Sequence, residues 1–253
     1  VGMSALDTAI ANTALPAMAE QLHATPADSV WIVNAYQLAM VATLLPIAAL
    51  GETIGYRRVY VAGMALFTLA SLACALAWSL PVLIVARLFQ GLGAAAIMGV
   101  NTALLRATYP ARLHGRGFGN NALVVAIGFA LGPSLASIIL AASSWQWLFG
   151  IHVLPGIVAF FMARKVLPDP RRASHRVDRV AGIYNVVAFS MAVLALGDAA
   201  HRVGMKTMLK AALVALVFFD LLLRRERGHP APLLPVALFR RPLFALSTVT
   251  DPN

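Results

Sequence analysis

The sequence predicts an all-α membrane protein, and its composition is the first observation that indicates this class. Of the 253 residues, 60% are hydrophobic and only 12% are charged, whereas soluble domains carry roughly 25% charged residues. The charges fall in short clusters between long apolar stretches. These stretches lack the alternating hydrophobicity of a membrane β-barrel, so helices, which satisfy their own backbone hydrogen bonds, are expected to cross the bilayer several times.

Eight apolar segments have the length of a membrane-crossing helix. Each contains roughly 19 to 25 residues, enough to span about 30 Å of hydrocarbon at about 1.5 Å per residue. The segments are 1–19, 30–50, 59–78, 81–105, 118–142, 146–166, 180–199 and 205–223. Residues 242–253 are expected to be the start of a truncated ninth helix, and we therefore interpret the chain as a fragment of a longer protein.

Basic residues gather in alternate loops between these segments. Most of the 20 lysines and arginines lie in the loops on one side, of which 167–179 and 224–241 are the most basic. Because positively charged loops stay in the cytoplasm, we expect these loops and the amino end to be cytoplasmic, in a protein of the cell inner membrane. The net charge of +10 is spread over several loops, which favours contact with membrane lipids and argues against nucleic-acid binding.

One arginine, Arg87, lies inside the fourth apolar segment. A charge near the centre of a membrane helix costs about 2.5 to 3.5 kcal/mol, so this side chain needs a partner. Gln90 and Gly91 lie one helical turn further along the same face, which would suit a polar cavity. The alternative is snorkelling to the membrane surface, since Pro81 begins the segment only six residues earlier.

Further polar side chains lie in the first two segments. Asp7 is a carboxylate inside the first segment, where it either stays neutral through desolvation or is paired with a cation. Asn34, Tyr36 and Gln37 bring hydrogen-bonding groups into the second segment.

Other residues argue for a transport protein without catalytic groups. Trp31, Trp145 and Trp147 lie near segment ends and are expected to anchor the helices at the membrane interface. The sequence has no HExxH, GxSxG or GxxxxGK[ST] motif, so we expect no enzyme activity, no metal site and no cofactor.

Five stretches, in order along the chain, resemble motifs of the major facilitator superfamily. LDTAIANTALP (6–16) is similar to the first-helix motif LDxTIVNxALP of its 14-helix drug/proton antiporter branch, and ALGETIGYRRVYVAG (49–63) to the loop motif GxLADRxGRR. LIVARLFQGLGAAA (83–96) resembles the fourth-helix motif, an arginine followed by Gln-Gly-x-Gly-Ala. GFALGPSLAS (128–137) resembles the antiporter motif GxxxGPxxGG, and SWQWLFGIHVLPG (144–156) the motif WRWxFxINxPxG.

The resemblance implies a fold and a function. Residues 1–166 would form the amino-terminal six-helix bundle, and 180–223 a helix pair inserted before a missing carboxyl-terminal half. The protein would export amphipathic, cationic drug-like compounds in exchange for protons, without a cofactor. Asp7 and Arg87 would couple protons to transport, and four polar residues would line the substrate cavity: Tyr36, Asn34, Gln37 and Gln90.

The resemblance also implies a conformational switch in two places. In the loop between the second and third helices it would comprise Glu52, Gly55, Arg57 and Arg58. On the fifth helix, Gly128 and Gly132 would form a flat packing strip beside a bend at Pro133. The chain departs from the family pattern in the loop, where Glu52 replaces an aspartate and Thr53 and Tyr56 replace arginines, and on the fifth helix, where Ala136 and Ser137 replace glycines.

Two other functions stay open at this point. The chain could belong to a uniporter or symporter for a polar metabolite of the same superfamily. It could also be an inactive truncated fragment with no transport activity.

Overall fold

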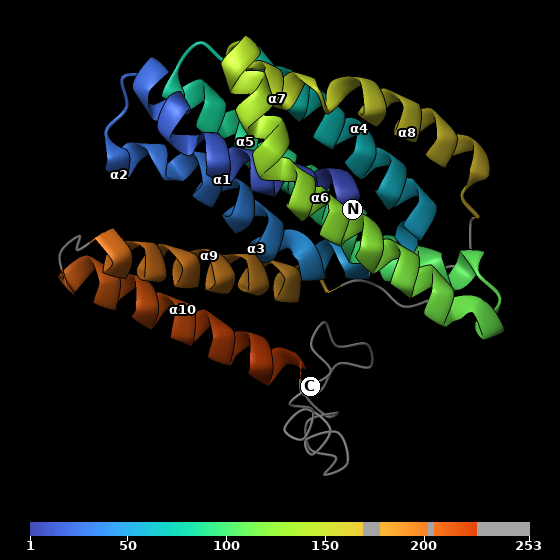
Figure 1. Cartoon of the computed structure of the whole chain (residues 1–253). Helices are drawn as coiled ribbons and strands as arrows, with labels where there is room; N and C mark the ends of the chain where they lie inside the picture. Colours follow the sequence, from blue (N-terminus) through green and yellow to red (C-terminus); the bar gives the residue numbers. More distant parts are fainter. Residues whose placement is uncertain (169–177, 202–204, 227–253) are drawn as a thin grey trace. The chain divides into compact units, whose positions relative to one another are not determined.

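The computed structural model describes residues 1–168, 178–201 and 205–226, and all elements in these ranges are helical (Figure 1). The all-α prediction is therefore confirmed for the described residues. The elements are α1 (Gly2–Gln21), α2 (Pro26–Ser29), α3 (Trp31–Ile54), α4 (Tyr56–Ala75), α5 (Leu80–Thr108), the 3-10 helix η1 (Ala111–Leu113), α6 (His114–Ala142), α7 (Trp147–Gly150), α8 (Val153–Val166), α9 (Arg179–His201) and α10 (Met205–Glu226). Most of the two expected basic loops and the expected ninth helix lie outside the described residues.

The chain divides into two compact units, Val1–Ser174 and His175–Asn253. The second unit contains α9 and α10, which pack along each other. Asp178, just before α9, accepts hydrogen bonds from Arg225 near the end of α10, at 2.6 Å from Nε and 3.1 Å from Nη2. These bonds hold the pKa of Asp178 below its usual range and join the two ends of the hairpin.

Five helical stretches of the described residues are long and apolar enough to cross a membrane. They are Pro26–Ile54, Tyr56–Ala75, Leu80–Thr108, Ala111–Ala142 and Trp147–Val166, all in the first unit. The expected first segment does form a helix, α1, but its polar residues keep it below this level of hydropathy, as Asp7 and Asn12 illustrate. The chain is a multi-pass helical membrane protein, although fewer helices meet the criterion of length and composition than the eight that were expected.

The expected sixth segment, 146–166, is not one continuous helix. α7 ends at Gly150 and α8 begins at Val153, with a turn at Ile151 and His152 between them. The last turn before this break positions Trp145 and Phe149 on the same side, with their rings edge to face and 6.2 Å apart between centroids. Both residues are buried.

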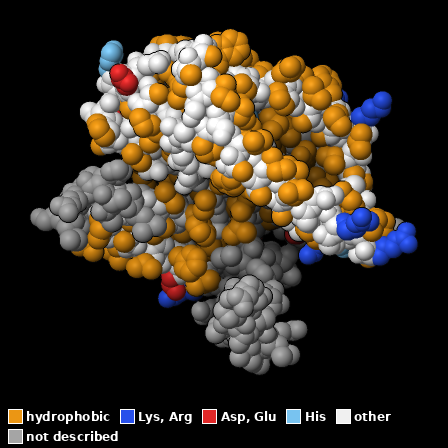
Figure 2. Space-filling model, viewed as in Figure 1, with side chains coloured by type: hydrophobic (Ala, Val, Ile, Leu, Met, Phe, Trp, Pro, Cys, Tyr) orange, Lys and Arg blue, Asp and Glu red, His pale blue; other side chains and the backbone are white. Residues whose placement is uncertain are grey.

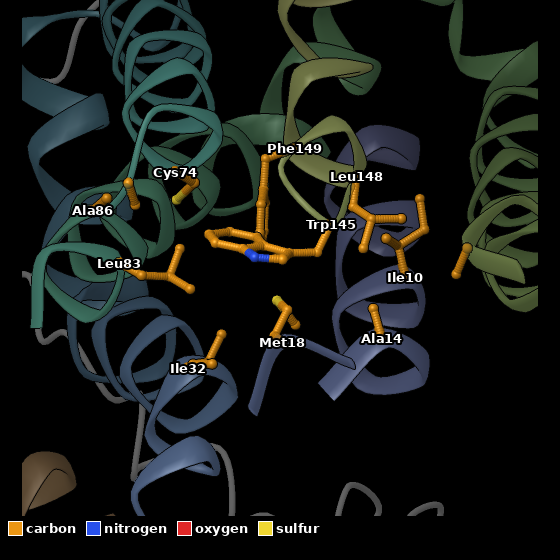
Figure 3. Close-up of a cluster of buried hydrophobic side chains, with 12 residues drawn as sticks. Ile10, Ala14, Met18, Ile32, Cys74, Leu83, Ala86, Trp145, Leu148 and Phe149 are labelled. Carbon is orange, nitrogen blue, oxygen red and sulfur yellow. The ribbon is translucent and has the colours of Figure 1, made fainter. Parts of the chain in front are cut away.

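Trp145 is the clearest correction to the sequence-based expectations. It was expected to anchor the protein at the membrane interface, but it is 1% exposed. Figure 3 shows its ring between side chains of several helices, among them Ile10 and Met18 of α1 and Leu83 of α5. The other two tryptophans predicted as interface anchors are more accessible, since Trp147 is 61% exposed and Trp31 is 37% exposed.

Apart from the buried Arg87, the described lysine and arginine side chains of the first unit lie at one end of it (Figure 2). The exposed or half-buried ones belong to the α3–α4 turn, to the connection between α5 and α6, and to the end of α8: Arg57, Arg58, Arg106, Arg112, Arg116, Arg164 and Lys165. On the face shown in Figure 2, the lysine and arginine side chains of this unit gather at one end and hydrophobic side chains cover much of the remainder. This is the charge distribution of a protein with one basic membrane face.

Small residues set how closely the helices of the first unit approach. A Cβ atom at Gly93 of α5 would lie 2.6 Å from the backbone nitrogen of Phe67 in α4, and a Cβ at Gly91 would overlap the Tyr36 carbonyl of α3. On the other side of the unit, a Cβ at Gly128 of α6 would lie 2.9 Å from the Gly2 carbonyl oxygen, and one at Gly132 would overlap the Cβ of Ala9 in α1. Both pairs of glycines therefore allow backbone-to-backbone packing.

The packing of α6 on α1 gives a direct test in one helix. We predict that Gly132→Ala lowers the free energy of unfolding by about 1 to 3 kcal/mol, because the new methyl group overlaps Ala9. Gly119→Ala, also in α6, meets nothing within 4 Å, so it should raise stability by roughly 0.5 to 1 kcal/mol through helix propensity alone. Unfolding of the purified chain in detergent measures both; equal effects at the two positions would contradict the close α1–α6 contact.

Candidate functional site

The candidate site is built around a buried ion pair between α1 and α5. Nη1 of Arg87 lies 2.6 Å from Oδ2 of Asp7, and the two side chains are 0% and 1% exposed. Nε of Arg87 donates to the carbonyl oxygen of Ile32, at the start of α3, at 3.0 Å. Arg87 therefore does not snorkel to the surface but joins three helices inside the bundle.

Gln90 completes the network one turn along α5. Its Oε1 accepts from Nη1 of Arg87 at 2.6 Å, while its Nε2 donates to Oδ1 of Asp7 at 2.9 Å. The same Nε2 also lies 2.9 Å from Oγ of Ser71 on α4. The thiol of Cys74, one turn later on α4, donates to Oε1 of Gln90 over 3.6 Å. Both atoms of the amide are therefore used, and the network extends to a fourth helix.

Aromatic rings enclose the arginine. Its Cζ lies 4.3 Å from the ring centroid of Tyr36 and 5.5 Å from that of Phe149. A guanidinium over an aromatic face is stabilised by the quadrupole of the ring, more so where water is excluded. The two rings therefore stabilise the positive charge of Arg87, although neither ring carries a formal negative charge as Asp7 does.

A small cavity lies beside this pair. It has a volume of about 160 Å³ and is lined by side chains of α1, α3, α5 and α6: Ser4, Ala5, Thr8, Tyr36, Gln37, Met40, Val41, Met98, Val125 and Phe129. Tyr36 belongs both to this lining and to the enclosure of Arg87. The cavity is thus separated from the ion pair by one aromatic residue, and its lining mixes hydroxyl and amide groups with apolar side chains.

The structure brings together all but one of the residues predicted for proton coupling and for the substrate cavity. Asp7, Arg87 and Gln90 form the network, and Tyr36 and Gln37 line the adjacent cavity. Asn34 is half-buried on α3 and is not part of the cavity lining.

The α3–α4 turn depends on Gly55. This residue separates the two helices with φ 107° and ψ 127°, a backbone conformation that side chains with a Cβ rarely adopt. Glu52 is half-buried in the last turn of α3, while Arg58 is exposed on α4. Arg57 donates a hydrogen bond to the backbone carbonyl of Arg164 at the end of α8. The turn is thereby tied to α8.

The glycine strip of α6 packs against the turns of α1 that carry Asp7. Gly128 approaches Ala5 and Leu6, and Gly132 approaches Ala9. Pro133 is exposed beside this strip and lies inside the continuous helix α6. If α6 moved along α1, it would therefore act on the residues of α1 that lie just before and just after Asp7.

Some members of this site were not predicted from the sequence. Ser71, Cys74 and Phe149 contact the network, and His152 is 1% exposed with its ring edge-on to Phe67 at 6.1 Å between centroids. Two of these residues stand at motif positions, because Phe149 matches the phenylalanine of the family motif WRWxFxINxPxG and His152 stands where that motif has an asparagine. Ser71 and Cys74 are ordinary residues of an apolar segment.

Comparison with known proteins identifies the class to which this fold and site belong. Residues 1–250 match the Major Facilitator Superfamily. The chain therefore belongs to this family of membrane transporters, and the resemblance seen in its motifs is confirmed.

Individual relatives agree with this assignment. The chain is 47% identical over 254 residues to the uncharacterized transporter YebQ of Escherichia coli (strain K12), covering 99% of this chain and 55% of that protein. It is 31% identical over 249 residues to the riboflavin transporter RibZ of Clostridioides difficile (strain 630), covering 98% and 54%. It is 34% identical over 248 residues to the putative multidrug resistance protein MdtD of Salmonella typhi, covering 96% and 52%. The chain thus spans about half the length of the curated relatives it matches.

The buried pair predicts that the effect of removing one charge on the free energy of unfolding depends strongly on whether the other charge is present. We predict that Arg87→Gln alone lowers the free energy of unfolding by about 3 to 5 kcal/mol, because it leaves Asp7 as a buried charge without its cation. The double variant with Asp7→Asn should be less destabilised than the sum of the two single variants, as a double-mutant cycle in detergent would measure.

An exposed ion pair in the same chain provides the control. Arg224 and Asp220 lie 2.7 Å apart, with side chains that are 71% and 53% exposed. The cycle of Arg224→Gln and Asp220→Asn should give a coupling of only about 0 to 1 kcal/mol. A coupling for the buried pair as small as for this exposed pair would contradict the structural role of the Arg87–Asp7 contact.

Proposed function

We propose that this chain is the amino-terminal part of a proton-coupled exporter of the 14-helix drug/proton antiporter branch, located in the inner membrane. The observation that carries the proposal is the position of Tyr36, which lines the cavity and also covers the guanidinium of Arg87. A compound bound in the cavity would therefore contact Tyr36. Protonation of Asp7 would affect Arg87, whose guanidinium the same Tyr36 ring covers.

Asp7 is proposed to carry the proton. As a carboxylate it accepts from Arg87 and Gln90; as a neutral acid it would lose its attraction to the arginine. Arg87 would then keep the Gln90 oxygen, the Ile32 carbonyl and two aromatic rings, none of which carries a negative charge. A buried arginine without its counter-ion is unfavourable, so protonation would drive a rearrangement.

The rearrangement is proposed to move α1 against α6. Transporters of this type alternate access by rocking one bundle against another around a site near the middle of the membrane, and a shift of α1 on α6 within the amino-terminal bundle is proposed to accompany that motion. The glycine strip at Gly128 and Gly132 gives α1 and α6 a flat contact, next to the bend-prone Pro133. The turn formed by Glu52, Gly55, Arg57 and Arg58 is proposed to dock against the carboxyl-terminal half of the transporter.

The substrate is proposed to be an amphipathic, cationic drug-like compound. The apolar lining with a few hydroxyl and amide groups has the chemistry of such a binding site, although the volume of about 160 Å³ requires the cavity to widen when the compound binds. MdtD is named a putative multidrug resistance protein. A second candidate is a polar metabolite, which the name of the riboflavin transporter RibZ favours.

The coupling proposal predicts a loss of proton exchange in Asp7→Asn. In a transporter that contains this chain with a carboxyl-terminal half, inverted vesicles with an internal acid load should release protons when a cationic substrate is added. Asp7→Asn should remove this release but keep substrate binding, because the cavity lining stays intact. Arg87→Lys should keep partial activity, since it retains the charge but not the planar fork that reaches three partners.

Glu20→Gln is the matched control, because Glu20 is an exposed carboxylate on the same helix. It should leave proton release unchanged. Wild-type proton release in Asp7→Asn would refute the coupling role, and uptake of a metabolite together with protons would favour the second candidate.

The orientation proposal predicts opposite labelling at the two ends of the first unit. In a Cys74→Ser background, single cysteines replace Asp28, exposed between α1 and α3, and Lys165, exposed at the end of α8. An impermeant maleimide added outside the inner membrane should label position 28 and reach position 165 only after the membrane is disrupted. The reverse pattern would show that the basic end is not cytoplasmic.

A further inference from the structure

A groove between α4 and α8 lies apart from the buried ion pair and its cavity and has two parts. One part, of about 450 Å³, is lined by Arg57, Arg58, Val61, Ala62, Phe160 and Arg164. The other, of about 410 Å³, is lined by Ala65, Thr68, Leu69, Ile157, Phe160 and Phe161. Phe160 belongs to both linings, so the two parts are continuous.

The first part concentrates positive charge. Three of its lining residues are arginines, and none of the described lining residues is acidic. Arg57 is held by the carbonyl of Arg164, and the guanidinium of Arg164 lies 5.6 Å from the ring centroid of Phe160. These contacts fix two of the three cations at the mouth of the groove, where an anion with several oxygens would be bound by charge-assisted hydrogen bonds.

The second part is apolar and continues along the same faces of both helices. From Arg58 to Leu69 the lining residues advance eleven positions along α4, which corresponds to about 16 Å of helix. Along α8 the lining runs back from Arg164 to Ile157. Leu69 and Phe161 are 65% and 62% exposed, as expected for side chains that face hydrocarbon.

We propose that this groove binds an anionic phospholipid, with its phosphate among the three arginines and one acyl chain along the apolar part. Charge complementarity selects the headgroup, since an anionic phosphate near several arginines is favoured at a membrane surface. An acidic protein segment could satisfy the arginines, but it would leave the apolar continuation without a matching group. The groove shares no residue with the cavity beside Tyr36. It includes Arg57 and Arg58 of the α3–α4 turn, but lipid binding to the 253-residue chain does not depend on that turn docking against a carboxyl-terminal half.

The first test compares lipids on the purified 253-residue chain in a neutral detergent. Dioleoyl phosphatidylglycerol should raise the unfolding temperature and stay bound in native mass spectra, whereas dioleoyl phosphatidylcholine should do neither. The double variant Arg58→Gln/Arg164→Gln should weaken phosphatidylglycerol binding about 30-fold. This is roughly the loss expected when two arginines are removed from a membrane surface. The backbone carbonyl that accepts from Arg57 is kept in this variant.

Arg112→Gln with Arg116→Gln is the matched control, since it removes the same charge from exposed positions at the same end of the unit but outside the groove. This control should bind phosphatidylglycerol like the wild type. Equal weakening in the two double variants would overturn the proposal, because binding would then follow net charge rather than the groove.

The second test separates a lipid from free phosphate and does not rely on the arginine variants. Inorganic phosphate and dihexanoyl phosphatidylglycerol should stabilise the wild type less than the dioleoyl lipid, because they cannot fill the apolar part. Ala65→Trp, which fills that part, should remove the advantage of the long chains, while Ala122→Trp, exposed on α6, should keep it. Equal stabilisation by phosphate and by the dioleoyl lipid, or an unchanged long-chain advantage in Ala65→Trp, would overturn the proposal.

Discussion

The ion pair between Arg87 and Asp7 is the interaction on which the first unit depends. Two charges that are 0% and 1% exposed are tolerated inside an apolar bundle only when further hydrogen bonds offset the cost of removing them from water. Gln90 supplies such bonds by accepting from the arginine and donating to the carboxylate, whereas Nη2 of Arg87 has no hydrogen-bond partner among the described residues. These hydrogen bonds, together with the one from Arg87 to the Ile32 carbonyl, therefore require α1, α3 and α5 to lie close to one another at the same height in the bundle.

Small residues make that meeting possible. Arg87 can reach the Ile32 carbonyl because α3 and α5 approach closely, which Gly91 permits against the backbone of Tyr36. On the opposite side, Gly128 and Gly132 bring α6 onto the stretch of α1 that contains Asp7. The glycines of the family motifs therefore serve the polar network as well as helix packing. Trp145 and Phe149 belong to the buried apolar cluster of the bundle, together with side chains such as Ile10 and Leu83.

The helices and the individual polar residues could be predicted from the sequence, but their partners could not. The lengths of the apolar segments predicted the helices. The cost of burying a charge in a membrane helix singled out Asp7 and Arg87, each on its own, as candidate functional residues. Nothing in the spacing indicates that position 7 meets position 87, because no local pattern determines which helices are neighbours. The resemblance placed both in one functional group without giving their contact.

Other differences have the same origin in tertiary packing. Trp145 was assigned to the interface from its place near a segment end, but position along a segment does not reveal a turn that folds back into the bundle. Ser71 and Cys74 are small residues of an apolar segment, so only the arrival of Gln90 beside them makes them part of the site. Of the polar residues on α3, Gln37 lines the cavity and Asn34 does not, a distinction set by the rotation of the helix about its axis.

α4 connects the two sites of the first unit through its opposite faces. One face presents Ser71 and Cys74 to Gln90, and the other presents Arg58 and Leu69 to the groove against α8. The close contact of Gly63 with Gly93 and Ala96 fixes α4 against α5 in between. A molecule in the groove would therefore brace the helix whose hydroxyl group holds the Gln90 amide, and a rearrangement of the Arg87–Asp7 network would act on α4 through the same hydrogen bond. A ligand in the groove and a rearrangement of the buried pair would therefore both act on α4, although the two sites share no cavity.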